Sequence, residues 1–217
     1  MKKIILTVSM LLILSLVPFS YAQFGGGAGP KFHAEFKPVV GGWAEYQMIR
    51  KGDQPTKMKI AIVGKEGDAY WYESIMEIKR EGKVISKMLV SGSPDDTKNV
   101  KRMVVKSGDQ PAMEMPVQMM PSSADQEQKG KLTDKGTETI KVPAGTFKTR
   151  HMQYKDGPDI VDIWVSKDIS PYGIVKSQSK DFEMVLLGNG TGATTLITET
   201  LQKFEMPQLP ERRQKRK

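Results

Sequence analysis

The sequence contains no cysteine and only two histidines, and these absences limit the chemistry available to it. Without cysteine there is no lipid-attachment residue of a bacterial lipoprotein, no disulfide, no thiol nucleophile and no thiolate metal site. A Gly-x-Ser-x-Gly turn, which would mark a serine nucleophile, is also missing. We therefore expect a protein that is not an enzyme and that carries no cofactor.

Long apolar runs are missing too, apart from one at the N-terminus. Two lysines precede an apolar run over residues 4–17, and Ser20-Tyr21-Ala22 then puts small residues at the −3 and −1 positions of a cleavage site. This is the layout of a secretory signal peptide, because the run is shorter than the roughly 20 residues of a membrane span. We predict that residues 1–22 are removed, leaving 217 − 22 = 195 residues of a soluble bacterial periplasmic protein.

The net charge of +8 is concentrated at the two ends of the chain. The signal peptide carries +2 and the C-terminal tail +4, which leaves 8 − 2 − 4 = +2 for the rest. We predict that residues 207–217 form a basic disordered tail, with contact to an anionic membrane surface as the alternative. The basic residues of the tail are Arg212, Arg213, Lys215, Arg216 and Lys217. Nucleic acid is not an expected partner, because no aromatic residues interleave with these charges.

The rest of the chain is dominated by period-two alternation, the pattern of half-buried strands. Residues 23–38 are a Gly-rich linker, and residues 39–206 are expected to form a single β domain. Its last strand is expected in the stretch ATTLITETLQKF, residues 193–204. Turn-forming clusters recur roughly every 10–20 residues, which leaves no room for crossover helices. The fold class predicted is mainly β: an antiparallel, strongly curved sheet or incomplete β-barrel of about ten or eleven strands, with a short helical or irregular lid segment.

The stretch TETIKVPAGTFKTRHMQY, residues 137–154, predicts a β-hairpin. Pro143 presets φ for a tight turn, and Gly145 can take the positive φ that closes it. Ile140 and Val142 before the turn are expected to pair with the strand that contains Phe147. The strand runs on to His151, which we interpret as a hydrogen-bonded structural residue and not as a hydrolase base.

The segment 111–130 is unusual because four methionines fall within eight of its residues and three prolines interrupt any central strand. Three interpretations remain open. The methionines fill gaps in the core, or they form a flexible lid over an apolar cavity, or they bind a soft metal such as Cu(I). Ser122 or Ser123 could cap a short helix within the segment.

Three short phrases carry a resemblance to known proteins. The hairpin phrase Val142-Pro143-Ala144-Gly145-Thr146-Phe147 is followed by Trp164-Val165-Ser166 and then by Gly173-Ile174-Val175-Lys176. This order resembles that of uncharacterised bacterial periplasmic families similar to the LolA/LolB lipoprotein-carrier fold. The resemblance covers about residues 137–180 and implies an unclosed β-barrel with a helical lid over an apolar concavity. It assigns no functional residue.

The function expected is binding or transport of an apolar small molecule or lipid in the concavity of an LolA/LolB-like fold. The inward side chains would contact the ligand, and the methionine-rich segment would be a movable cover. The alternatives are a non-enzymatic interaction or structural module of the cell envelope with a filled core and, more distantly, a soft-metal binder or a hydrolase. The predicted ligand-binding residues are Met58, Ile60, Ile62, Tyr72, Met76, Met113, Met115, Met119 and Met120.

Overall fold

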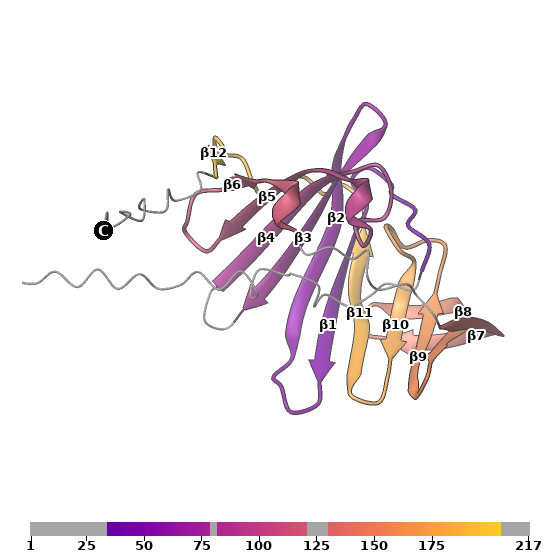
Figure 1. Ribbon diagram of the computed structural model, residues 1–217. Helices are drawn as coiled ribbons and strands as arrows, with labels where there is room; N and C mark the ends of the chain where they lie inside the picture. The colour runs from indigo at the N-terminus through magenta and orange to yellow at the C-terminus, as the bar shows by residue number, and fades with distance from the viewer. Residues whose placement is uncertain (1–33, 79–81, 121–129, 205–217) are drawn as a thin grey trace, which may run out of the picture.

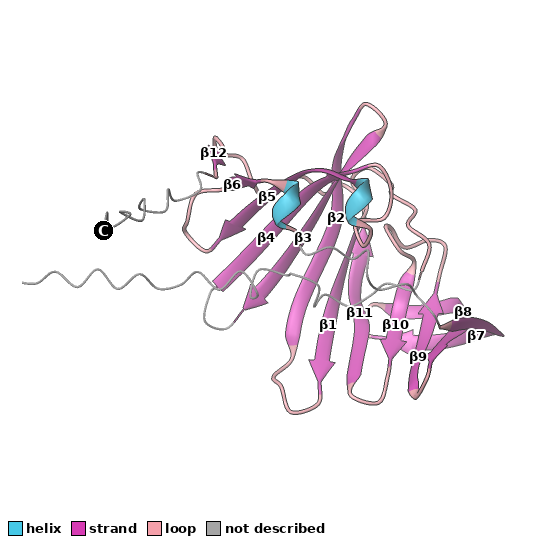
Figure 2. Cartoon of the chain, viewed as in Figure 1, coloured by secondary structure: helices cyan, strands magenta, loops and turns pink. Residues whose placement is uncertain are grey.

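The computed structural model describes residues 34–78, 82–120 and 130–204, and these residues form a 12-stranded sheet (Figure 1). The predicted signal peptide, most of the predicted linker, the basic tail and the proposed helix after Ser122 or Ser123 lie outside the described residues. The described residues also form two short 3₁₀ helices beside the sheet (Figure 2). No described helix is long and apolar enough to cross a membrane.

Most consecutive strands are neighbours in the sheet, but the chain crosses the sheet between β6 and β7 and again between β11 and β12. Their bounds are β1 (Trp43–Arg50), β2 (Thr56–Glu66), β3 (Ala69–Ile78), β4 (Gly82–Val90), η2 (Thr97–Asn99), β5 (Val100–Ser107), β6 (Met113–Met115), η3 (Val117–Met119), β7 (Lys131–Val142), β8 (Gly145–Asp156), β9 (Asp159–Val165), β10 (Ile174–Gln178), β11 (Phe182–Gly190) and β12 (Gln202–Lys203).

The strand order is β12-β6-β5-β4-β3-β2-β1-β11-β10-β9-β8-β7, and every pair is antiparallel except β12 with β6. The predicted fold class is therefore confirmed. Two details differ from the prediction. The methionine-rich segment contributes the short strand β6 beside the sheet edge, where prolines are tolerated. The expected strand over residues 193–204 is almost entirely irregular, because only Gln202 and Lys203 pair.

The sheet has two chemically distinct faces, which we name by their residues. The inner face carries Tyr46 opposite Met58 and Ile62 opposite Tyr72, with Ile60 between Met58 and Ile62 on the same side of β2, and all five side chains belong to the larger buried cluster. The outer face carries Trp43, Lys59 and Glu73. The alternation seen in the sequence is confirmed, because Met58, Ile60 and Ile62 are all buried on the inner face.

The sheet curls so strongly that its far hairpin returns to an earlier strand. The backbone N–H of Ala144, at the tip of the β7–β8 hairpin, donates to the carbonyl of Leu186 in β11 at 3.2 Å. Three strands lie between β7 and β11 in the sheet. Val142 is consequently buried in the larger cluster. The predicted hairpin is confirmed: Ile140 pairs with Phe147, Val142 pairs with Gly145, and Gly145 has a φ of 134°.

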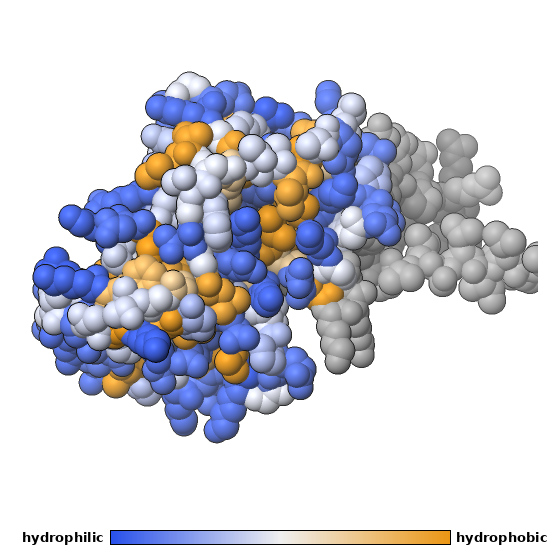
Figure 3. All heavy atoms as spheres, turned by 180° about the vertical axis from the view of Figure 1, so that it is seen from behind, coloured by the Kyte–Doolittle hydropathy of each residue, from blue (hydrophilic) through white to orange (hydrophobic). Residues whose placement is uncertain are grey.

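The outer face of β3–β5 is covered by the chain after β11, residues 191–204, which we call the C-terminal strap. Ile197 and Leu201 of the strap pack on Ile85 and Val104 in a second, smaller cluster. The backbone N–H of Gln202 donates to the carbonyl of Ala112, and Lys106 forms an ion pair with Glu199. Figure 3 views the molecule from the side opposite to Figure 1, where hydrophilic side chains surround smaller apolar patches.

Candidate functional site

The inner face is covered in the middle of the sheet and is more open over β3–β6, toward one edge. On β1, β2 and β11 most of its side chains are buried, among them Tyr46, Ile60 and Leu186, which are fully buried. On β3–β6 most of its side chains are only half-buried, although the outer positions Ile85, Leu89 and Val104 of the same strands are buried. We call this half-buried region the open inner face. It consists of Ser74, Met76, Val84, Ser86, Met88, Met103, Val105, Ser107, Met113 and Met115.

The open inner face carries no charged residue at any of these positions, whereas the outer positions of the same strands are rich in charge. Lys87 and Arg102 lie over the ring of Trp71 on the outer face, at 4.9 and 5.3 Å from its centroid. Arg102 also binds Glu114 at 2.8 Å. Charge is therefore confined to one side of β3–β6, and the other side offers an apolar surface.

Methionine dominates the inner face. Register places nine of the 14 methionines of the chain on it. Met58 lies opposite Met76, and Met48 lies opposite Met184. Because the unbranched thioether adapts to irregular shapes, such a face suits apolar partners of variable form. The nine are Met48, Met58, Met76, Met88, Met103, Met113, Met115, Met152 and Met184.

Three serines, Ser74, Ser86 and Ser107, interrupt the apolar character of the open inner face. Ser74 on β3 and Ser86 on β4 stand directly opposite each other, and both are half-buried. The next position in this cross-strand row is Val105 on β5. A pair of hydroxyls inside an apolar surface is the arrangement that orients a ligand with one polar end.

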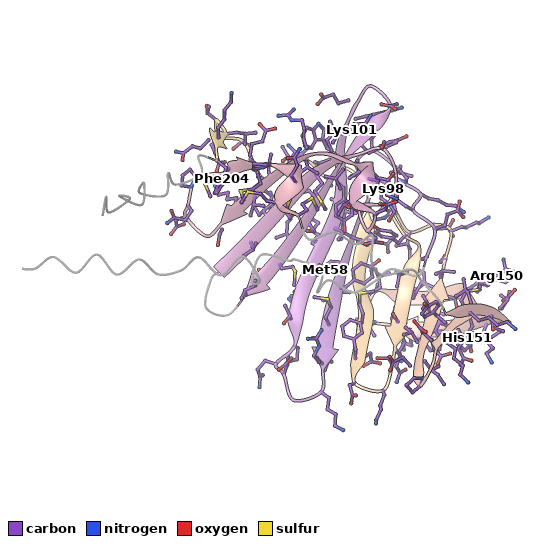
Figure 4. All side chains as sticks on the ribbon, viewed as in Figure 1. Met58, Lys98, Lys101, Arg150, His151 and Phe204 are labelled. Carbon is purple, nitrogen blue, oxygen red and sulfur yellow. The ribbon has the colours of Figure 1, made fainter. Side chains whose placement is uncertain are left out.

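The predicted ligand-binding residues fall into three environments. Met58, Ile60, Ile62 and Tyr72 are buried in the larger cluster, and Met58 lies near the middle of the sheet (Figure 4). Met76, Met113 and Met115 belong to the open inner face. Met119 at the end of η3 is 40% exposed, while Met120 packs against the larger cluster. Of the four methionines after Pro111, two thus lie in β6, one in η3 and one directly after η3.

An aromatic group closes the inner face next to its open part. Phe36, within the predicted linker, contacts Tyr172 and Tyr72 with ring centroids 5.4 and 6.4 Å apart. Tyr46 donates its hydroxyl to the carbonyl of Ile174 at 3.1 Å. Burial raises the pKa of Tyr46, Tyr72 and Tyr172 above the ordinary tyrosine value, so their hydroxyls stay neutral.

No protein-family model matches the chain, and no curated protein matches it by sequence. Among solved structures, a candidate lipoprotein of Parabacteroides distasonis aligns at 12% identity with a TM-score of 0.37, over 72% of this chain and 99% of the other. A candidate exported protein with a YmcC-like fold from Bacteroides fragilis gives 12% identity and a TM-score of 0.36, over 73% and 100%. MucB gives 13% identity and a TM-score of 0.45, over 75% of this chain and 57% of MucB.

The two later phrases of the sequence resemblance prove to be the two arms of one hairpin. Trp164 on β9 pairs with Lys176 on β10, whose ammonium lies 5.5 Å from the indole centroid. Ser166 donates its N–H to the carbonyl of Gly173 at 2.7 Å. A Cβ on Gly173 would lie 2.7 Å from the carbonyl oxygen of Ser166, and Gly173 has a φ of +74°. These phrases therefore encode the geometry of this hairpin and its turn.

His151 lies in a polar network on the outer face of β7–β9, at the far end of the sheet in Figure 4. Its Nε2 is 2.8 Å from Asp162 Oδ1, its Nδ1 is 3.1 Å from Glu138 Oε1, and its ring stacks on Trp164 at 4.5 Å. The predicted hydrogen bonding of His151 is thus confirmed. Among the described residues, no group of three His, Asp or Glu side chains is arranged to hold a metal ion.

Sequence reasoning missed the open inner face as a unit. Its residues alternate correctly, but alternation does not say which half of a face is covered by the rest of the chain. Val84, Ser86 and Met88 were available as a signal, because the run KVISKMLVS places them on one side of a strand. The alternation alone does not show that the strap covers the outer side of that strand, which leaves the inner side as the more open one.

Proposed function

We propose that the protein is an extracytoplasmic binding or carrier protein that holds an apolar ligand, such as a lipid acyl chain, against the open inner face. The observation that carries the proposal is the half-burial of uncharged, mostly apolar side chains over four neighbouring strands. The outer side of the same strands is already sealed by the strap and by charged residues. The inner side is thus the surface of β3–β6 that gains from a further apolar partner.

The driving force would be removal of apolar surface from water. Each methylene of an acyl chain that is buried contributes about 0.8 kcal/mol before the entropic cost of binding is subtracted. Methionines such as Met88 and Met103 can change rotamer to follow chains of different length or unsaturation. Ser74 and Ser86 would hydrogen-bond the polar end of the ligand and so fix its orientation.

The proposed activity is binding without catalysis. Its location outside the cytoplasm rests on the signal-peptide pattern of residues 1–22. The filled part of the inner face, where Phe36 and Tyr172 cover Tyr72, supports the competing possibility of an envelope interaction module. The two functions differ in one measurable respect, because only the carrier binds a lipid.

Native mass spectrometry of the mature protein, purified from the periplasm without detergent and then titrated with palmitate, tests the proposal. We expect a co-purifying lipid mass or a saturable palmitate complex. In a Val84→Thr and Val105→Thr double variant, palmitate should bind about tenfold more weakly. Replacing two buried methyl groups by hydroxyls removes about 1.6 kcal/mol, and 1.4 kcal/mol is tenfold in affinity.

The matched control makes the same substitutions at two exposed valines outside the site, Val39→Thr and Val40→Thr. This control should bind palmitate as the parent protein does. A bare polypeptide mass that persists after incubation with periplasmic lipid extract would contradict the carrier function and favour the interaction module.

A further inference from the structure

Three methionines form a straight row across the last strands of the open inner face. Met88 on β4 is directly opposite Met103 on β5, and Met103 is directly opposite Met115 on β6. Side chains that face each other across antiparallel strands have Cβ atoms about 4.5–5.5 Å apart, within reach of a flexible thioether. Met113 lies two residues before Met115 on the same face. We call Met88, Met103 and Met115 the thioether row.

Most of these residues are not part of the packed core. Met103, Met113 and Met115 belong to neither of the two buried clusters found among the described residues, and all three are half-buried. On the outer face of the same strands, the buried apolar side chains are Ile85 and Val104, which contain no sulfur. Packing therefore does not explain why sulfur-containing side chains occupy the inner positions.

The chemistry around the row is selective for one kind of metal ion. Thioethers are soft, uncharged ligands that favour Cu(I) over Mg²⁺, Ca²⁺ or Zn²⁺. Carboxylate ligands lie on the other side of these strands, because charged residues such as Glu114 occupy their outer positions. The described residues contain no His, Asp and Glu group suited to a competing metal. This surface would therefore bind a soft monovalent cation in preference to a hard divalent one.

We infer that the thioether row is a binding site for Cu(I), with Ag(I) as a redox-stable analogue. Each of the three sulfurs donates a lone pair to the ion, which gives a trigonal, sulfur-only coordination. No electron is transferred, since the ion binds in its monovalent state. This site goes beyond the proposed carrier function, although both use the open inner face.

The experiment compares the mature parent protein with Met103→Leu and Met115→Leu in one double variant. Leucine keeps the apolar volume and removes the sulfur. Cu(I) affinity is measured under anaerobic conditions by competition with a chromogenic Cu(I) chelator, and the ligand set by X-ray absorption spectroscopy. The matched control is Met58→Leu with Met76→Leu, another directly opposed pair on the inner face.

We expect the parent protein and the control to bind one Cu(I) per chain with sulfur-only coordination, and the Met103/Met115 variant to bind at least tenfold more weakly. Circular dichroism and thermal unfolding verify that the variant is folded, and palmitate binding measured on the same samples tests the carrier function separately. Unchanged Cu(I) affinity in the variant, nitrogen or oxygen ligands in the spectrum, or no competition by the parent protein would each overturn the inference.

Discussion

Glu73 in β3 holds the C-terminal strap through a bond to Thr195, 122 residues later in the chain. Thr195 Oγ1 donates to one carboxylate oxygen of Glu73 at 2.6 Å, and the N–H of Leu196 donates to the other at 3.1 Å. Glu73 is 1% exposed. Because a buried carboxylate must have its hydrogen bonds satisfied, this residue fastens the strap over the outer face and leaves the inner face as the open one.

Glu73→Gln should lower the free energy of unfolding by about 1–3 kcal/mol, because the amide group cannot accept both hydrogen bonds. Urea denaturation measures the change. Glu77→Gln, on the same face of the same strand but exposed, is the control and should stay within about 0.5 kcal/mol of the parent. Equal losses for the two variants would show that Glu73 does not fasten the strap.

Gly173→Ala should destabilise the protein more than Gly157→Ala. Both glycines have a positive φ, which costs a side chain about 1–2 kcal/mol. A Cβ at Gly157 meets nothing within 4 Å, whereas at Gly173 it would collide with the carbonyl oxygen of Ser166. We expect a total loss of roughly 2–4 kcal/mol at Gly173. Thermal unfolding compares the two, and similar midpoints would contradict the collision.

Dilute hydrogen peroxide should oxidise the methionines in the order of their solvent exposure, the most exposed first. Met119, Met103, Met113 and Met115 should be converted to sulfoxide well before Met184, which is 1% exposed. Peptide mass spectrometry over time gives the rate at each position. Sulfoxides on the open inner face should also weaken palmitate binding, since they make it polar. Oxidation of Met184 at the rate of Met103 would contradict the division of the inner face.

Lowering the pH should weaken the attachment of the C-terminal strap, because its ion pair between Glu199 and Lys106 depends on an ionised carboxylate. The hydrogen bond from Lys106 lowers the pKa of the Glu199 carboxyl, and Arg102 likewise lowers that of Glu114 beside β12. A lowered folded-state pKa means that the unfolded chain takes up protons first, so this stability is present above the ordinary glutamate pKa and is lost as the pH falls through the lowered value.

The free energy of unfolding should therefore fall between about pH 5 and pH 3, and Glu199→Gln should make that fall shallower. The effect will be small and weaker in high salt, because the Lys106–Glu199 pair is still partly accessible to solvent. Urea denaturation at a series of pH values measures it. A variant whose pH profile overlays that of the parent protein would rule out this contribution.

His151→Ala should destabilise the far end of the sheet without affecting ligand binding. The change removes the hydrogen bond to Asp162 and the stacking on Trp164, which together contribute about 1–3 kcal/mol. Hydrogen exchange of β7–β9 amides and palmitate titration on the same sample measure the two effects. A large loss of palmitate binding in a folded variant would place His151 in the functional site.

Much of the fold could be predicted because strand alternation is a local property. Met58, Ile60 and Ile62 are buried together since side chains of one strand alternate between two faces, and Pro143 and Gly145 set their turn through their own φ preferences. The strand over residues 193–204 could not be excluded in this way. Its residues favour strands, but they bind the outer face through Thr195 and Ile197 and not through a ladder.

The sequence by itself determined which residues share a face, where the hairpins turn and which chemistries are absent, because those depend on composition and near neighbours. Only the tertiary structure decided which part of the inner face is covered. Ala144 reaches Leu186, and Thr195 reaches Glu73, through contacts between residues far apart in the chain. Those contacts bury both faces of some strands and one face of others, and that difference leaves Met88, Met103 and Met115 half-buried in a row.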